Sequence, residues 1–160
     1  MDVGLLSKSY AVRRLNEGDV DALFELMREN TLYYKYHPPF VTKESIVEDM
    51  RALPLKKGYE DKYYVGFFDE NGLVANMDLI LAYPENEVAF IGFFMTDVRF
   101  QKKGVGSKII SETCACLKSL GFKKVRLGVD RGNPQSFAFW KKNGFSVLDE
   151  GEYIRMEAAL

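Results

Sequence analysis

The residues best placed to do chemistry form a glycine-rich turn, Gln101-Lys-Lys-Gly-Val-Gly-Ser107, which opens the longest predicted helix, Lys103 to Leu120. The first turn of a helix presents backbone N–H groups without intrahelical partners and the positive end of the helix dipole, so it favours an anion. Basic residues cluster around this turn: Arg99, Lys102, Lys103 and Lys108. The pattern predicts a site for a phosphate or pyrophosphate group.

Two familiar phosphate loops do not fit this turn. The dinucleotide pattern Gly-x-Gly-x-x-Gly fails because Ile109 stands where the third glycine belongs, and Gly-x-x-x-x-Gly-Lys-Ser/Thr fails because Ser107 follows Gly106. The sequence therefore argues against NAD and against a nucleoside triphosphate. For the turn taken alone, an ordinary helix start with solvated lysines is the alternative.

The glycine-rich turn and a segment downstream of it each carry a sequence motif. The Gln-x-x-Gly-x-Gly spacing of residues 101–106, after an apolar strand, resembles the acyl-CoA pyrophosphate loop of the GNAT superfamily of N-acetyltransferases. Further on, Asn133-Pro-Gln-Ser-Phe-Ala-Phe-Trp-Lys-Lys-Asn-Gly-Phe145 is similar to that family's Asn-x-x-(x)n-Phe-Tyr-x-x-x-Gly-Phe stretch. The resemblance covers the chain from about Tyr10 to Met156 and leaves the acceptor unspecified.

The resemblance implies a slot for acetyl-CoA, with CoA as the released product. In such proteins the fourth and fifth strands splay apart, and the pantetheine arm pairs with the fourth strand. A backbone N–H freed by the splay stabilises the oxyanion while an amine attacks the thioester directly. The cofactor-binding residues that this implies are Phe94, Met95, Thr96, Val98, Gln101, Lys102, Lys103, Gly104, Val105, Gly106, Ser107, Asn133 and Phe139.

Two positions depart from the family pattern. Trp140 stands where many members place a tyrosine that protonates the leaving thiolate, and Gly128 stands where some members carry a glutamate base. An indole N–H is no useful proton source near neutral pH. An alkyl thiol has a pKa of roughly 8.5, so its thiolate can leave without obligatory protonation. The catalytic residues therefore stay unassigned, and the candidates are Glu87, Asp97, Asp78 or water for the base and Tyr153 or Tyr10 for the acid.

An aromatic run falls where the family's acceptor-binding loop lies. Its members, Tyr33, Tyr34, Tyr36, His37 and Phe40, would suit an aromatic or cationic amine by stacking, and about half of them are expected in the core. Because His37 stands beside two prolines, we interpret it as a loop residue rather than as a general base.

The order of elements, taken with the resemblance, predicts an α/β GNAT fold. Its central sheet is mixed and mostly antiparallel, with about seven strands, splayed fourth and fifth strands and about four flanking helices. Strands are predicted at Tyr10–Leu15, Tyr63–Phe68, Leu73–Leu81, Val88–Met95 and Lys124–Val129, with closing strands in Phe145–Met156. Helices are predicted after Asp19 and after Thr42 as N-caps, from Lys103 to a stop at Gly121, and from Asn133 to a stop at Gly144.

Length and composition limit the classes of protein to which the chain can belong. A chain of 160 residues fits one domain, here residues 1–160, and a formal charge of −1 argues against nucleic acid and anionic membranes as partners. Cys114 and Cys116 diverge on one helix, so they cannot pair with each other, and no Cys/His cluster predicts a metal. With no apolar run of about 18 residues, we expect a cytoplasmic protein. A homodimer is left open as its assembly.

These observations together predict an acetyl-CoA-dependent N-acetyltransferase that moves an acetyl group to a primary amine of a small molecule or a peptide. The alternative is a non-catalytic acyl-CoA-binding module that senses acyl-CoA or engages a protein partner. Trp140 favours this alternative because it removes the usual acid, whereas the pyrophosphate loop fits both. Thiol release from acetyl-CoA with a panel of amines distinguishes the two.

Overall fold

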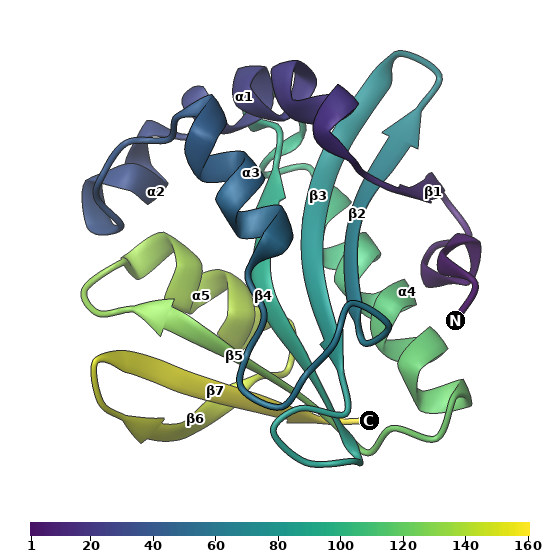
Figure 1. Cartoon of the computed structure of the whole chain (residues 1–160). Helices are drawn as coiled ribbons and strands as arrows, with labels where there is room; N and C mark the ends of the chain where they lie inside the picture. Colours follow the sequence, from purple (N-terminus) through teal and green to yellow (C-terminus); the bar gives the residue numbers. More distant parts are fainter.

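A single twisted sheet organises the chain, whose computed structural model describes residues 1–160 (Figure 1). Its strands are β1 (Ala11–Arg14), β2 (Lys62–Asp69), β3 (Gly72–Leu81), β4 (Val88–Thr96), β5 (Lys124–Asp130), β6 (Ser146–Glu150) and β7 (Tyr153–Ala159). They follow the order β1-β2-β3-β4-β5-β7-β6, and every neighbouring pair is antiparallel except β4 and β5. The predicted mixed, mostly antiparallel sheet is confirmed.

Five α-helices flank the sheet, one more than predicted. They are α1 (Val20–Arg28), α2 (Thr31–Tyr36), α3 (Lys43–Arg51), α4 (Val105–Ser119) and α5 (Pro134–Lys142). Three short 3-10 turns accompany them: η1 (Val3–Leu6), η2 (Glu17–Asp19) and η3 (Val98–Phe100). None of these helices combines the length and the apolar character that crossing a bilayer would require.

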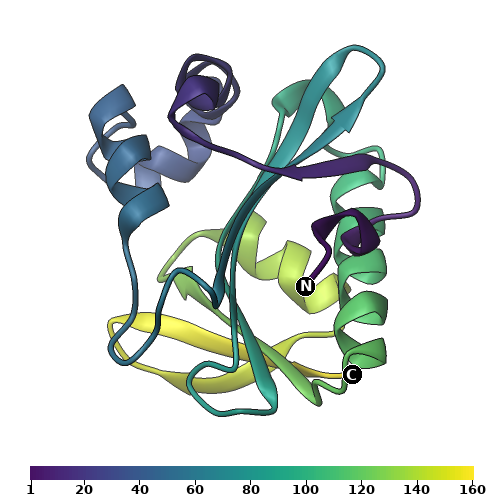
Figure 2. The same ribbon diagram turned by 45° about the vertical axis from the view of Figure 1, so that its right-hand side comes forward.

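Each face of the sheet carries its own hydrophobic core. On one face, α4 and α5 contribute buried side chains such as Ile109 and Trp140 to a cluster of 20 residues. On the other face, α1 and α3 contribute Leu23 and Ile46 to a cluster of nine. Figure 2 shows α4 and the group of α1 to α3 on opposite sides of the sheet. Because each buried aliphatic side chain contributes roughly 1.5–3 kcal/mol, both layers hold the sheet firmly.

The parallel strands β4 and β5 pair only over their first halves. Their register joins Val88–Ile91 to Lys124–Leu127 and goes no further. The next residue, Gly92, is left without a partner on β3 and forms a β-bulge. A Cβ at this position would lie only 3.1 Å from the Asp78 carboxylate, so glycine suits it. Because a bulge bends its strand, the rest of β4 leaves β5, and the predicted splay is confirmed.

Local capping signals explain where most helices begin and end. Thr42 starts α3 with a reciprocal capping box, as predicted. Gly121 and Gly144 have positive φ angles of 95° and 88° and follow α4 and α5, as predicted. Helix α1 begins after Asp19, as predicted, but the Asp19 side chain makes no capping hydrogen bond to this helix. Asn16 instead caps η2, Asp19 closes that capping box, and η2 continues into α1.

The segment Tyr33–Phe40 is not a loop throughout, because its first part belongs to α2. Two aromatic contacts hold this short helix: the Tyr33 ring meets Phe93 of β4 with centroids 5.7 Å apart, and Tyr34 meets Phe40 at 5.2 Å. Tyrosine has only moderate helix propensity. The contact with Phe93 is tertiary, so a local sequence pattern does not reveal it.

Glu112 fastens the N-terminal segment to α4. Its carboxylate accepts hydrogen bonds from the hydroxyls of Ser7 and Ser9, each at 2.5 Å, and from the backbone N–H groups of Lys8 and Ser9. Partial desolvation opposes ionisation, but these four hydrogen bonds outweigh it and lower the pKa of Glu112 to about 2. The charged form therefore stabilises the fold.

Replacing Glu112 with glutamine should lower the free energy of unfolding by about 1–2 kcal/mol at pH 7, because charged hydrogen bonds become neutral ones. The pKa of Glu112 is lower in the folded chain than its ordinary 4.5, so its contribution is complete above that value and is lost as the pH falls toward 2. Urea unfolding should therefore show a smaller difference between wild type and Glu112→Gln at pH 3 than at pH 7. Equal differences at both pH values would contradict a role for the charge.

Candidate active site

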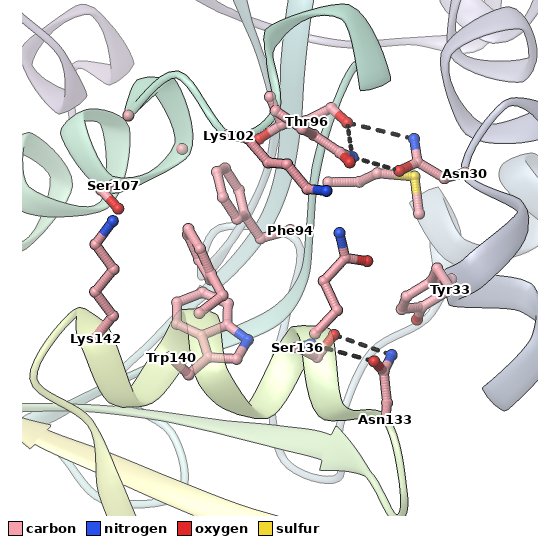
Figure 3. Close-up of a pocket in the computed structure, with 16 residues that line it drawn as sticks. Asn30, Tyr33, Phe94, Thr96, Lys102, Ser107, Asn133, Ser136, Trp140 and Lys142 are labelled. Carbon is pink, nitrogen blue, oxygen red and sulfur yellow. Dashed lines mark hydrogen bonds between the residues drawn. The ribbon is translucent and has the colours of Figure 1, made fainter.

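A cavity of about 470 Å³ lies where β4 leaves β5 (Figure 3). Its walls come from four parts of the chain: the α1–α2 connection with the start of α2, the end of β4, the loop and first turn of α4, and α5. The bulge in β4 and the close packing of α4 and α5 thus bring together segments that are far apart in the sequence.

The loop before α4 forms one end of the cavity and presents unpaired backbone N–H groups. Lys102 and Gly104 have positive φ angles of 58° and 79°, a conformation that turns successive N–H groups into an anion-binding nest. In the first turn of α4, the N–H groups of Val105, Gly106 and Ser107 donate to no backbone carbonyl. No side chain caps this helix start, and no acidic residue lies in its first turn. These donors fit a phosphate group.

The side chains at this end of the cavity are cationic or neutral. Figure 3 shows the Lys142 ammonium reaching from α5 toward the Ser107 hydroxyl, and Lys102 extending into the cavity. The lining contains these two lysines and no acidic residue. An anionic ligand is therefore favoured here.

Aromatic side chains form the middle of the cavity. Phe94 of β4 stacks on Phe139 of α5 with centroids 6.0 Å apart, and Phe139 meets Trp140 edge-on at 5.0 Å. Gly106 allows α4 to approach this wall, since a Cβ there would lie 3.1 Å from the Phe139 ring and 3.2 Å from the Thr96 hydroxyl. The result is a narrow, largely apolar slot between β4 and α5.

Two residues predicted to bind the cofactor use their side-chain amides in hydrogen bonds within the protein. Gln101 Nε2 donates to Asn30 Oδ1 at 2.7 Å and to the Thr96 carbonyl at 3.0 Å, which holds the loop against the end of β4. Asn133 Oδ1 accepts from the Ser136 N–H at 3.1 Å and so caps α5 (Figure 3). Both side chains line the cavity and position its walls.

Ten of the thirteen predicted cofactor residues line the cavity, and Val98, Lys103 and Val105 do not. Val98 lines a separate cleft beside α1. The Lys103 ammonium donates to the Arg99 carbonyl at 2.8 Å. Val105 packs against the core. The loop therefore brings five of its seven residues to the cavity: Gln101, Lys102, Gly104, Gly106 and Ser107.

Sequence reasoning missed several lining residues: Asn30, Gln135, Ser136 and Lys142. Lys142 lies three positions after Phe139 on α5, so helical spacing carried a signal for it. No sequence signal indicated Asn30, because the residue that it contacts, Gln101, is 71 positions away.

The predicted catalytic candidates lie outside the cavity lining. Glu87 precedes β4 at the paired end of the strand, and its carbonyl accepts from the Lys123 N–H. Hydrogen bonds from the Arg99 side chain lower the pKa of Asp97, which makes it a poor base. Tyr153 starts β7 and is exposed, and Tyr10 is partly buried against the larger core cluster.

A region of acidic and aromatic side chains, formed by Asp49, Tyr64 and Asp78, lies near Tyr33 on the sheet face covered by α1 to α3. Asp78 of β3 forms an ion pair with the deeply buried Lys62 at 2.7 Å. Burial raises the pKa of Asp78 and of Asp49 in α3, and both carboxylates further raise the already elevated pKa of the buried Tyr64. This region thus holds two carboxylates against one ammonium.

Two hydrogen-bond acceptors in this region have no donor. Asn76 Oδ1 and Asp78 Oδ1 are both buried and unpaired, although Asn76 Nδ2 reaches the Tyr64 hydroxyl at 3.4 Å. Unpaired buried acceptors are costly, so a donor-rich group is favoured nearby.

Comparison with known proteins identifies the family of this chain. The sequence model of the acetyltransferase (GNAT) family matches residues 20–145. A spermidine N(1)-acetyltransferase of Thermoplasma acidophilum is 25% identical over 162 residues, covering 93% of this chain and 96% of that protein. The chain belongs to the acetyltransferase (GNAT) family.

Solved structures share the fold. The PaiA N-acetyltransferase of Thermoplasma acidophilum, in complex with coenzyme A, has a TM-score of 0.71 at 22% identity and covers 93% of this chain and 98% of its own. An acetyltransferase from Thermus thermophilus has a TM-score of 0.81 at 20% identity, covering 98% and 99%. With the family membership, the chain is an acetyl-CoA-dependent N-acetyltransferase, and the non-catalytic alternative is disfavoured.

Proposed function

We propose that this enzyme, a single domain of residues 1–160, holds acetyl-CoA in the cavity at the splay and acetylates a small amine that carries several positive charges, as a polyamine does. The pyrophosphate would lie on the amides of the α4 start beside Lys102 and Lys142. The pantetheine arm would follow Phe94, Met95 and Thr96 along β4. The acceptor would enter from the Tyr33 side.

The observation that carries the cofactor assignment is the uncapped start of α4 opening onto an apolar slot. Its N–H groups donate to no protein acceptor, and Lys102 and Lys142 add positive charge. An anionic group at one end and an uncharged chain along Phe94 and Phe139 satisfy both parts of the cavity.

The chain's own residues position and polarise the reaction. Acetyl-CoA supplies an acetyl thioester, whose carbonyl accepts the attack of an amine. Alternate backbone N–H groups of β4 beyond Ile91 have no β5 partner. Such donors stabilise a developing oxyanion, and one of them contributes about 3–4 kcal/mol to lowering the barrier. The bulge at Gly92 is thus the feature that makes the catalytic backbone available.

The proposed acceptor class is supported by the region of acidic and aromatic side chains near Tyr33. The two carboxylates of Asp49 and Asp78 outnumber the one buried ammonium, that of Lys62, and the oxygens Asn76 Oδ1 and Asp78 Oδ1 have no hydrogen-bond donor within the protein. An alkylammonium supplies donors and positive charge together, and tyrosine rings favour it further. The curated relative carries the name of a spermidine acetyltransferase, which agrees with this class.

A panel of acceptors tests this proposal. Spermidine should be acetylated with a kcat/KM at least about tenfold above that of glycine or glutamate, and Asp49→Asn should raise the KM for spermidine about tenfold by removing roughly 1.4 kcal/mol of attraction. Asp149→Asn, which changes an exposed carboxylate paired with Arg155, is the matched control and should leave the KM unchanged. Equal turnover of anionic and polycationic amines would refute the acceptor class.

We also propose a cytoplasmic location, supported by the thiol chemistry. Cys114 and Cys116 are both free, and burial raises the pKa of Cys114 to about 11. The fold thus depends on no disulfide, as is usual in a reducing compartment.

A further inference from the structure

The only histidine in the chain pairs with an aspartate far away in the sequence. His37 directly follows α2, and its Nδ1 lies 2.9 Å and 3.1 Å from the two carboxylate oxygens of Asp130, the last residue of β5. A carboxylate only accepts hydrogen bonds, so Nδ1 carries the ring proton. In the neutral ring, Nε2 then has the free electron pair that a base requires.

This pair lies on the acceptor side of the splay. Asp130 follows the part of β5 that pairs with β4, and the His37 ring centroid is 5.3 Å from that of Tyr33, which lines the cavity. The His37 side chain is 41% exposed, whereas that of Asp130 is 14% exposed. The aspartate is therefore shielded, and the imidazole is accessible to an entering molecule.

We propose that Nε2 of His37 removes a proton from the acceptor ammonium and that Asp130 is a positioning residue for the ring; this rests on the proposed function. One N–H bond of the ammonium breaks, the proton bonds to Nε2, and the electron pair stays on the amine nitrogen. The amine becomes a neutral nucleophile, and the imidazolium lies against the Asp130 carboxylate. The exposed ring then returns the proton to water.

The other titratable groups near His37 fit this role. Burial raises the pKa of Tyr33, so its phenol keeps its proton at neutral pH. Asp49 of α3 interacts electrostatically with His37 and adds negative charge near the imidazolium. Tyr153 of β7 lies in register with Asp130. None of these side chains is cationic.

The decisive variant is His37→Gln, because a glutamine amide can still donate to Asp130 but has no basic nitrogen. With spermidine as the probe, kcat/KM at pH 7 should fall at least about 100-fold while the affinity for CoA and the unfolding midpoint are retained. As the pH approaches about 10, the amine loses its own proton and the two rates should converge. Lys35→Gln, two residues before His37 in α2, is the control and should match wild type throughout.

A spectroscopic readout follows the ring itself, since one histidine gives one set of imidazole resonances. Adding spermidine to the CoA-bound protein should shift the His37 resonances. Asp130→Asn should increase the share of the tautomer protonated at Nε2 and lower kcat/KM at least about tenfold.

The outcomes separate two failures. If wild type acetylates spermidine and His37→Gln does so within about threefold at pH 7, or if spermidine leaves the His37 resonances unmoved, His37 is not the base. If wild type binds CoA and acetylates no amine, the proposed function fails, and this inference fails with it.

Discussion

Replacing Gly104 with aspartate should reduce the affinity for CoA at least about 100-fold and leave the fold intact. The residue precedes α4 in the anion-binding loop, with a φ of 79° and open space around the position of a Cβ. A carboxylate there would face the pyrophosphate at short range, and like charges about 5–6 Å apart repel by roughly 3 kcal/mol near a protein surface. That energy corresponds to about two orders of magnitude in affinity.

Gly104→Asn is the matched control, because asparagine has nearly the same shape and tolerates a positive φ as well as aspartate does. It should weaken CoA binding less than about tenfold. Calorimetric titration with CoA measures both affinities, and thermal unfolding without CoA checks that both variants fold. If the two variants bind equally, charge at this loop does not matter and the pyrophosphate lies elsewhere.

Much of the fold could be predicted because its signals are local. In β5, Val125, Leu127 and Val129 alternate with exposed or half-buried residues, and all three are buried as that period requires. The stop of α4 at Gly121 likewise follows from a single residue that adopts a positive φ. Periodicity and capping depend on neighbours within one or two turns, so a sequence carries them directly.

The candidate site was predictable where one short segment builds it. The loop from Gln101 to Ser107 combines glycine, basic residues and a helix start, and most of it lines the cavity. The role of Gln101 was not predictable, because its amide donates a hydrogen bond to Asn30, which lies in a distant segment of the chain. Such a role depends on how α1, β4 and the loop pack together.

The pairing of His37 with Asp130 is a second contact that the sequence could not predict. The two residues are 93 positions apart, and their contact depends on α2 forming where a loop was expected and on β5 ending opposite it. Neither residue has a neighbour in sequence that signals the pair. Histidine beside two prolines therefore suggested a loop residue, and only the tertiary arrangement gives the ring a carboxylate.

Trp140 should contribute strongly to stability and little to chemistry. Its side chain is 7% exposed and packs edge-on against Phe139 and Phe145, with centroids 5.0 Å and 5.1 Å away. Trp140→Ala should therefore lower the free energy of unfolding by about 3–5 kcal/mol, the range for deleting a large buried aromatic side chain. Urea unfolding measures this loss. A change below about 1 kcal/mol would show that the aromatic wall is not part of the core.

The role of Trp140 in the reaction is tested by comparing Trp140→Phe with Trp140→Tyr in single-turnover acetyl transfer. Phenylalanine keeps most of the packing and removes the N–H, so the rate should stay within about threefold of wild type, since an indole supplies no proton near neutral pH. Tyrosine should match or exceed wild type, because a positioned acid contributes about 10²–10⁴-fold where the leaving thiolate needs its proton. A drop of more than about 100-fold in Trp140→Phe at unchanged CoA affinity would show that the indole itself takes part in the reaction.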